Sequence, residues 1–294
     1  MEDYFPTFRP AGKAIVRASK RLFRALRWLS IRLAILIAAF LVIHLILQVI
    51  WGRSLEHKLA DLRSRGEPVT ALDLAPKPIP DCQNAAIIYQ QAFVLLKSSK
   101  TPSRKFDTSD PICELLYKKN EGERADGLIT EARAVIQRSA GVYPLLAQAA
   151  SRPRCRFPVR WEQGCDASFN HLEPLRDCAR LVAARAIIEA RDDRIDAALD
   201  DVALGLRLSK AVAEEPTLIS QMSRCTYVRM AIKPLREIAG TQRISATEAR
   251  RVYDKLGQIS LNQGFVLAMR GERAMMSSVF DSVRKDMRLA MSGG

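Results

Sequence analysis

The stretch from Leu33 to Trp51, LAILIAAFLVIHLILQVIW, constrains this chain more than any other feature of its sequence. A helix rises about 1.5 Å per residue, so about twenty apolar residues cross a hydrocarbon core about 30 Å thick. His44 and Gln48 are the strongly polar residues of the stretch, and two such side chains do not make the polar stripe of a soluble helix. The stretch therefore predicts a membrane-spanning helix.

Two other interpretations of this stretch are a buried core helix and a cleaved signal peptide. The apolar region of a signal peptide is shorter, about 7 to 15 residues, and ends at a cleavage site of small residues. Here the run ends in Gln-Val-Ile-Trp-Gly-Arg, which favours a retained anchor. His44 is either a functional ionisable group or a neutral imidazole that bonds to a neighbouring helix.

The charge ahead of the span predicts its orientation. The chain has 294 residues and a net charge of +14, and residues 1–32 hold eight Lys or Arg side chains against two Asp or Glu. The flank after the span mixes both signs. Because basic flanks stay in the cytoplasm, we expect a cytoplasmic N-terminus and an exported C-terminal part. Since the basic excess is concentrated in this flank, nucleic-acid binding is not expected.

Residues 13–30 have the pattern of an amphipathic helix on a membrane surface. Basic side chains recur there at steps of three and four, with apolar residues on the opposite face. Such a helix would bind an anionic leaflet, and the alternative is a basic flank with no specific lipid role. The candidate headgroup contacts are Lys13, Arg17, Lys20, Arg21, Arg24 and Arg27.

The remaining chain predicts an all-α protein, because Ala, Leu and Arg are frequent and aromatic residues make up only 6%. We expect a basic segment (1–32), a transmembrane helix (33–51), a stalk with a proline-containing linker (52–80), and a domain of irregular helical hairpins, either a bundle or a short solenoid (81–294). The expected helix-start signals are Asp81, Asn170 with Glu173, Pro216, Ser245 with Glu248, and Asn262.

Three segments carry a resemblance: IPDCQNAAIIYQQA at 79–92, RPRCRFPVRWEQG at 152–164, and EARDDRIDAALDDVALGLRLSKAVAEEPTLISQMSR at 189–224. Together with the anchor, they resemble a group of bacterial single-pass membrane proteins of unknown function, whose members often continue past the last helix. The resemblance implies an inner-membrane protein with a helical periplasmic domain, and no catalytic residues. The helix pair at 170–209 also resembles one tetratricopeptide-type hairpin, with Ala186, Ala198 and Gly205 where helices approach closely.

The chain shows no motif for a metal ion or a cofactor, and we expect neither. All six cysteines follow the span, without a CxxC pair, and an exported domain permits disulfides. Cys155 and Cys165 bracket a loop rich in proline and aromatic residues, so they are the candidate disulfide. A serine hydrolase needs a histidine base, for which His171 is the candidate in the folded domain. A surface position near a helix start is the other interpretation of His171.

Two functions remain open. One is a non-catalytic scaffold or accessory subunit of an envelope or membrane complex. The other is an envelope enzyme of hydrolase type that uses His171, Glu162 and Glu173. The last helix bears an apolar stripe that either packs on its own domain or contacts another subunit, which is a second copy or a membrane partner. Its residues are Met269, Met276, Phe280, Val283 and Met287.

The predicted orientation is tested by reporter fusions at Gly52 and Gly294. A reporter that works only after export should be active at both sites, because the basic flank holds residues 1–32 in the cytoplasm. A fusion at Gly294 that is active only in the cytoplasm would contradict the orientation and remove the basis for the disulfide.

Overall fold

In the computed structural model the chain is built of helices, which confirms the all-α class. The structure describes residues 12–99, 110–117, 123–240 and 244–292, without the side chains of 12–26, 99, 123–125, 286 and 288–292. These described residues contain no β-strand, only an isolated bridge between Asn84 and Arg154. The chain divides into two compact units, residues 1–66 and residues 67–294.

Helix α1 (Gly12–Ser64) runs without a break through the amphipathic segment, the predicted span and the stalk. Its part from Arg27 to Ser64 is long and apolar enough to cross a membrane, and none of its most apolar window is buried. A core helix of a soluble protein would be largely covered. Within the span, Gln48 Nε2 lies 3.0 Å from His44 Nε2, so the two polar side chains bond to each other one turn apart.

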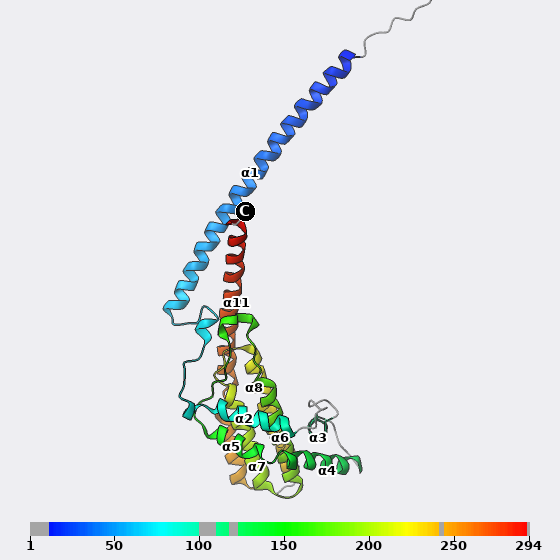
Figure 1. The fold of residues 1–294 in the computed structure, drawn as a ribbon, viewed down its shortest axis with the longest axis vertical. Coiled ribbons are helices and arrows are strands. Elements are labelled where there is room, and N and C mark those ends of the chain that lie inside the picture. Colours follow the sequence, from blue (N-terminus) through cyan, green and yellow to red (C-terminus); the bar gives the residue numbers. More distant parts are fainter. Residues whose placement is uncertain (1–11, 100–109, 118–122, 241–243, 293–294) are drawn as a thin grey trace, which may run out of the picture. The chain divides into compact units, whose positions relative to one another are not determined.

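The second unit contains fourteen further helical segments in the described residues (Figure 1). In chain order they are η1 (Leu72–Leu74), η2 (Asp81–Gln83), α2 (Ala85–Ser99), α3 (Pro111–Tyr117), α4 (Glu123–Arg138), α5 (Val142–Ser151), η3 (Trp161–Asp166), α6 (Leu172–Arg191), α7 (Ile195–Leu208), η4 (Ser209–Val212), α8 (Leu218–Ile232), α9 (Leu235–Gly240), α10 (Ala246–Gly257) and α11 (Leu261–Ser292). Helices α6 and α7 form the predicted antiparallel hairpin, and α8 packs against both.

Small residues allow these three helices to approach closely. Ala186 of α6 and Ala198 of α7 are fully buried in one apolar cluster. A Cβ added at Gly205 would lie 2.8 Å from Cβ of Ala231 on α8 and 3.9 Å from Val182 on α6. The closest approach at Gly205 is therefore between α7 and α8, whereas the sequence predicted it between the two helices of the hairpin.

The predicted helix starts are partly confirmed. Ser245 and Glu248 form the expected capping box at the start of α10. The expectation for Asp81 is wrong, because residues Asp81–Gln83 form a short 3₁₀ turn and α2 begins at Ala85. Asn84 takes the capping role, since its Oδ1 accepts a hydrogen bond from the Ala86 amide at 3.1 Å.

Three other start signals are displaced by one or two residues. Helix α6 begins after His171, so Asn170 and Glu173 form no capping box. Helix α8 begins after Thr217 rather than at Pro216, because the Thr217 hydroxyl accepts from the Ser220 amide. Helix α11 begins after Ser260 rather than after Asn262, and the Ser260 hydroxyl accepts from the Gln263 amide at 3.3 Å.

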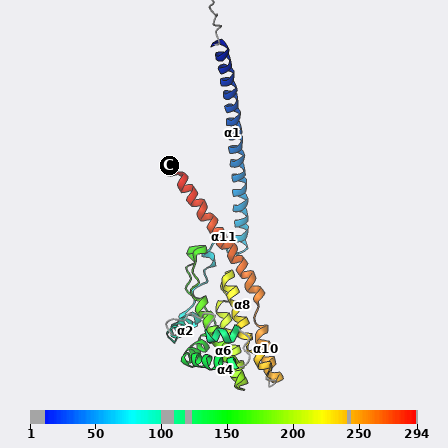
Figure 2. The same ribbon diagram turned by 90° about the vertical axis from the view of Figure 1, so that its right-hand side faces the viewer.

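Helix α11 packs on the start of α8 through small residues. A Cβ added at Gly271 would lie 1.6 Å from the Pro216 carbonyl oxygen, and one at Gly264 would lie 2.3 Å from Oε1 of Gln221. Ala268, between the two glycines, is fully buried. The first half of α11 is thus held against α8, and its red second half extends past the other helices of this unit (Figure 2).

The segment that follows α1 is bound to α11 as well. Nη2 of Arg273 donates to Oε2 of Glu67 at 2.7 Å, and the Ala71 amide donates to the Ser278 hydroxyl at 2.7 Å. Leu74 is buried in a cluster with Trp161 of η3. The proline-containing linker therefore packs on the helical unit through Val69, Ala71 and Leu74, which are buried.

The close contact of α11 predicts a large effect of Gly271→Ala. The new methyl group would meet backbone atoms of Pro216, so we expect a loss of about 3 kcal/mol or more in the free energy of unfolding. Thermal unfolding of the full chain in detergent, followed by circular dichroism, measures the loss.

Gly127→Ala is the matched control for Gly271→Ala. Gly127 lies inside α4 with open space around its Cβ position. Alanine there should be neutral or stabilising by about 0.5–1 kcal/mol. If both variants unfold at the same temperature, α11 does not pack on α8 as described.

Candidate functional site

The predicted apolar stripe lies on the exposed face of α11. Exposed fractions of its residues range from 48% for Met276 and Val283 to 66% for Phe280, with Met269 and Met287 between them. Val266 continues the stripe toward the start of the helix and is also exposed. The stripe is therefore exposed on the surface of its own unit. Packing on that unit was one of the two interpretations of the sequence, and contact with another subunit was the other.

Helical geometry explains why α11 has one face that is buried and another that is exposed. Positions three, four and seven apart share a face at 3.6 residues per turn. Gly264, Ala268, Gly271 and Met275 follow this spacing and are buried against the unit. The stripe follows the same spacing with an offset that places it on the opposite side of α11.

The stripe is an unusual surface for a folded domain. Full burial of a large apolar side chain contributes about 1.5–3 kcal/mol of free energy. A partner that covered the exposed half of one such residue would therefore contribute roughly 1 kcal/mol to binding. Large contiguous apolar patches on a protein surface often mark sites of contact with other molecules. Methionine suits them because its flexible thioether adapts to different partner surfaces.

The structured loop between α5 and α6 forms a second candidate site, which is polar and lies beside His171. His171 is 7% exposed, and its ring stacks on Phe157 with centroids 4.1 Å apart. Its Nε2 lies 2.7 Å from Oε1 of Glu215, within ion-pair distance but without the geometry of a hydrogen bond. His171 is thus a buried residue paired with Glu215, and neither Glu162 nor Glu173 contacts it within hydrogen-bonding distance in the described structure.

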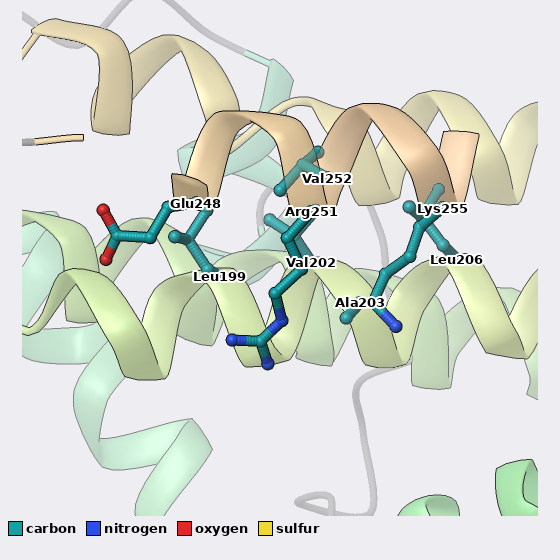
Figure 3. A pocket seen from close by; sticks show the side chains of 8 residues that line it. All are labelled: Leu199, Val202, Ala203, Leu206, Glu248, Arg251, Val252 and Lys255. Atoms are coloured by element: carbon teal, nitrogen blue, oxygen red, sulfur yellow. The ribbon is translucent and has the colours of Figure 1, made fainter. Parts of the chain in front are cut away.

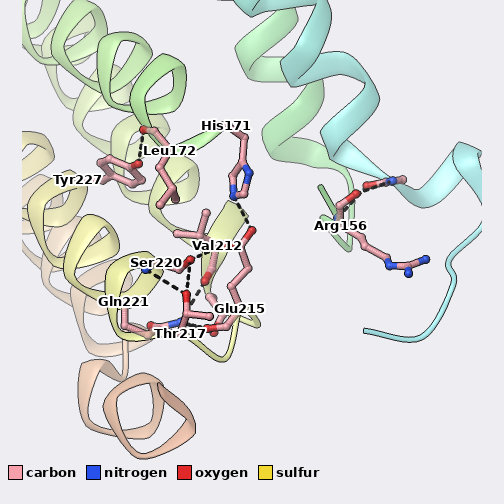
Figure 4. Close-up of polar contacts among 11 residues, drawn as sticks. Arg156, His171, Leu172, Val212, Glu215, Thr217, Ser220, Gln221 and Tyr227 are labelled. Atoms are coloured by element: carbon pink, nitrogen blue, oxygen red, sulfur yellow. Dashed lines mark hydrogen bonds and ion pairs between the residues drawn. The ribbon is translucent and has the colours of Figure 1, made fainter. Parts of the chain in front are cut away.

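Glu215 also binds the first turn of α8 (Figure 4). The Ser220 hydroxyl donates to its Oε2 at 2.5 Å, and the Thr217 hydroxyl donates to Ser220 at 2.8 Å. Nε2 of Gln221 donates to the Glu215 carbonyl at 2.9 Å. Glu215 therefore stands between Ser220 and His171, whereas a hydrolase triad needs the histidine next to the serine.

A narrow cleft adjoins this network. It is lined by Lys77 of the linker, by Arg154 and Arg156 of the loop, and by Glu214 and Glu215. Its cavity volume is about 10 Å³, which is room for about one water molecule. The cleft thus carries charges of both signs but no space for a substrate-sized ligand. Another cavity of about 10 Å³ lies between α7 and α10, and its lining includes Leu199, Val202 and Val252 (Figure 3).

The loop itself is fixed at both ends. Asn84 accepts from the Arg156 amide at 2.9 Å and donates to the Arg156 carbonyl at 3.1 Å, which pins the loop to α2. Trp161 is buried beside Leu74 and Met275. Phe157 and Trp161, the large aromatic residues of the loop, are both buried. The sequence carries no signal for Glu215, which lies more than forty residues away from His171 along the chain.

The predicted disulfide is not formed in the structure, where all six cysteines are free thiols. Cys155 is half-buried and Cys165 is exposed. Burial raises the pKa of the Cys155 thiol, and the carboxylates of Glu215 and Glu214 add to this effect. A raised pKa lowers the fraction of reactive thiolate. The pairing of Cys155 with Cys165 stays a prediction.

Of the candidate lipid contacts, only the side chain of Arg27 is described, and it is exposed. Lys13, Arg17, Lys20, Arg21 and Arg24 lie on the helical backbone of α1, but their side chains fall outside the described set. Among the described residues, no group of three or more His, Cys, Asp or Glu is placed to hold a metal ion.

Comparisons of the chain with known protein families, with curated proteins and with solved structures gave no match. The candidate sites in the described part of the chain are an exposed apolar helix face and a buried polar network beside a narrow cleft.

The buried network predicts a strong effect of Glu215→Ala. The change removes the hydrogen-bond acceptor of the Ser220 hydroxyl and the carboxylate beside His171 in the protein interior, so the free energy of unfolding should fall by about 2–4 kcal/mol. Denaturant unfolding of the full chain in detergent measures this loss.

Glu214→Ala is the control for Glu215→Ala, because Glu214 is adjacent in sequence but its side chain is 64% exposed. It faces Arg154 at 3.7 Å, and an exposed pair of this kind contributes little. We expect a change within about 0.5 kcal/mol. Equal losses for both variants would show that the network does not stabilise the fold.

Proposed function

We propose that this protein is a membrane-anchored, non-catalytic scaffold or accessory subunit of an envelope or membrane protein complex. Helix α1 anchors it in the inner membrane of a bacterial cell with the N-terminus in the cytoplasm. The helical unit lies on the far side of that membrane, and the stripe on α11 is its docking surface for other protein subunits or for a second copy.

The exposed stripe is the observation that carries this proposal. Its large side chains stay about half-exposed although the same helix buries its opposite face. Interfaces of protein complexes concentrate aromatic residues and methionine in their central part. A helix that is fixed on one side and apolar on the other is suited to such an interface, because little conformational freedom is lost on docking.

The polar site supports binding over catalysis. The Ser220 hydroxyl is bonded to a carboxylate and not to His171, and the adjacent cleft has room for one water molecule. The network instead joins the loop, α6 and α8, since the Tyr227 hydroxyl also donates to the Leu172 carbonyl at 2.6 Å. Its role in this proposal is to hold the helices in register.

The double variant Met276→Asp with Phe280→Asp tests the docking surface. Both side chains are exposed, so the isolated protein should keep its fold and its unfolding temperature. Charges in a desolvated interface are costly, and the amount of complex recovered from membranes in mild detergent should fall at least tenfold. Native gel electrophoresis of the solubilised membranes measures the complex.

The matched control is the pair Met222→Asp and Tyr253→Asp, one methionine and one aromatic residue on α8 and α10. They are 61% and 68% exposed and lie outside the stripe. Assembly should be unchanged for this control. A folded stripe variant that assembles like the wild type would contradict the proposed function.

A further inference from the structure

The stripe on α11 has the spacing of a coiled-coil seam. Val266, Phe280 and Met287 fall on one heptad position, with Arg273 between them, and Met269, Met276 and Val283 follow three residues after successive members of that set. Alternating steps of three and four residues are the pattern that packs one helix along another. The natural occupant of this surface is therefore a helix with the same spacing.

Arg273 is the one charged residue at these heptad positions, and its charge is paired within its own chain. Its Nη2 donates to Oε2 of Glu67 at 2.7 Å and lies 3.3 Å from the Pro68 carbonyl. The guanidinium is thus directed to the linker of its own chain and offset by a carboxylate. An unbroken apolar seam remains after it, in Met276, Phe280, Val283 and Met287.

The charges beside this seam are balanced. In this heptad Arg270 and Arg284 flank the seam on one side, and Glu272 and Asp286 flank it on the other. A seam flanked by one sign of charge would repel a copy of itself and attract an oppositely charged surface such as an anionic membrane. Mixed charges instead allow two identical helices to face each other and to pair across the contact.

A second copy of the chain brings a helix with matching spacing, because its own α11 bears the same stripe. Outside α1, the described residues show an exposed stripe with heptad spacing over six turns on α11. Anchoring by α1 would confine copies to one membrane, which raises their effective concentration. A two-fold contact of identical surfaces is the commonest form of protein assembly.

We propose that the stripe docks a second copy of this chain, so that two α11 helices pair along Met276, Phe280, Val283 and Met287. This inference rests on the proposed function, because it names the partner of the same docking surface. The inner face of α11 stays on α8 in each copy, so pairing needs no rearrangement of the helical unit.

Two differently tagged full-length chains, expressed together and extracted in mild detergent, test this pairing. Capture of one tag should recover the other tag for the wild type. Phe280→Asp and Val283→Asp should each lower that recovery at least tenfold. Val94→Asp is the matched control, since Val94 is an exposed valine on α2, and its recovery should be unchanged.

A photo-reactive residue at position 276 of the full chain gives an independent measurement in intact membranes. The expected product has twice the mass of the 32.9-kDa chain. A product with another protein, without the double-mass product, would overturn self-pairing and leave the proposed function standing. The absence of any protein product would overturn both. Unchanged recovery of the second tag in folded Phe280→Asp and Val283→Asp would show that copies associate elsewhere, and it would overturn pairing through α11.

Discussion

The contact between α11 and the start of α8 is the constraint on which the rest of the helical unit depends. It is a backbone contact, because no side chain fits between Gly271 and the Pro216 carbonyl. Once α11 lies there, Oε1 of Glu272 accepts from the Leu218 amide at 2.8 Å and completes the start of α8. The same placement brings Arg273 and Ser278 to the linker. The glycine face of α11 thus fixes the start of α8, the position of the linker and the direction in which the apolar stripe of α11 points.

The polar network around Glu215 has a related role on the other side of α8. Buried carboxylates are costly unless hydrogen bonds and charges surround them. Here the Ser220 hydroxyl donates to the Glu215 carboxylate, and His171, just before α6, lies within ion-pair distance of it. Gln221 donates to the Glu215 main-chain carbonyl. The stacked ring of Phe157 connects the network to the structured loop. These groups connect the loop with α6 and α8, and Glu215 lies between the histidine and the serine, so the two do not have the order of a catalytic triad.

The sequence predicted the fold class and most helices because apolar periodicity is a local signal. The long apolar helix, the helices α6 and α7, the capping box at Ser245 and the apolar stripe of α11 all follow from spacing within single helices. The exposure of the stripe was left open by the sequence. Two displaced helix starts are set by a neighbouring hydroxyl, which is Thr217 at α8 and Ser260 at α11. The pairing of His171 with Glu215 and the approach of Gly271 to Pro216 join distant parts of the chain. Local patterns do not report such contacts.

The central claim is that the outer face of α11 is covered by protein in the native membrane. Oxidation footprinting of methionines measures this directly, because thioether oxidation depends on solvent exposure. In native membranes Met276 and Met287 should be protected, and after dissociation in detergent they should oxidise as fast as Met222, which is exposed on α8. Equal oxidation of Met276, Met287 and Met222 in native membranes would contradict the claim.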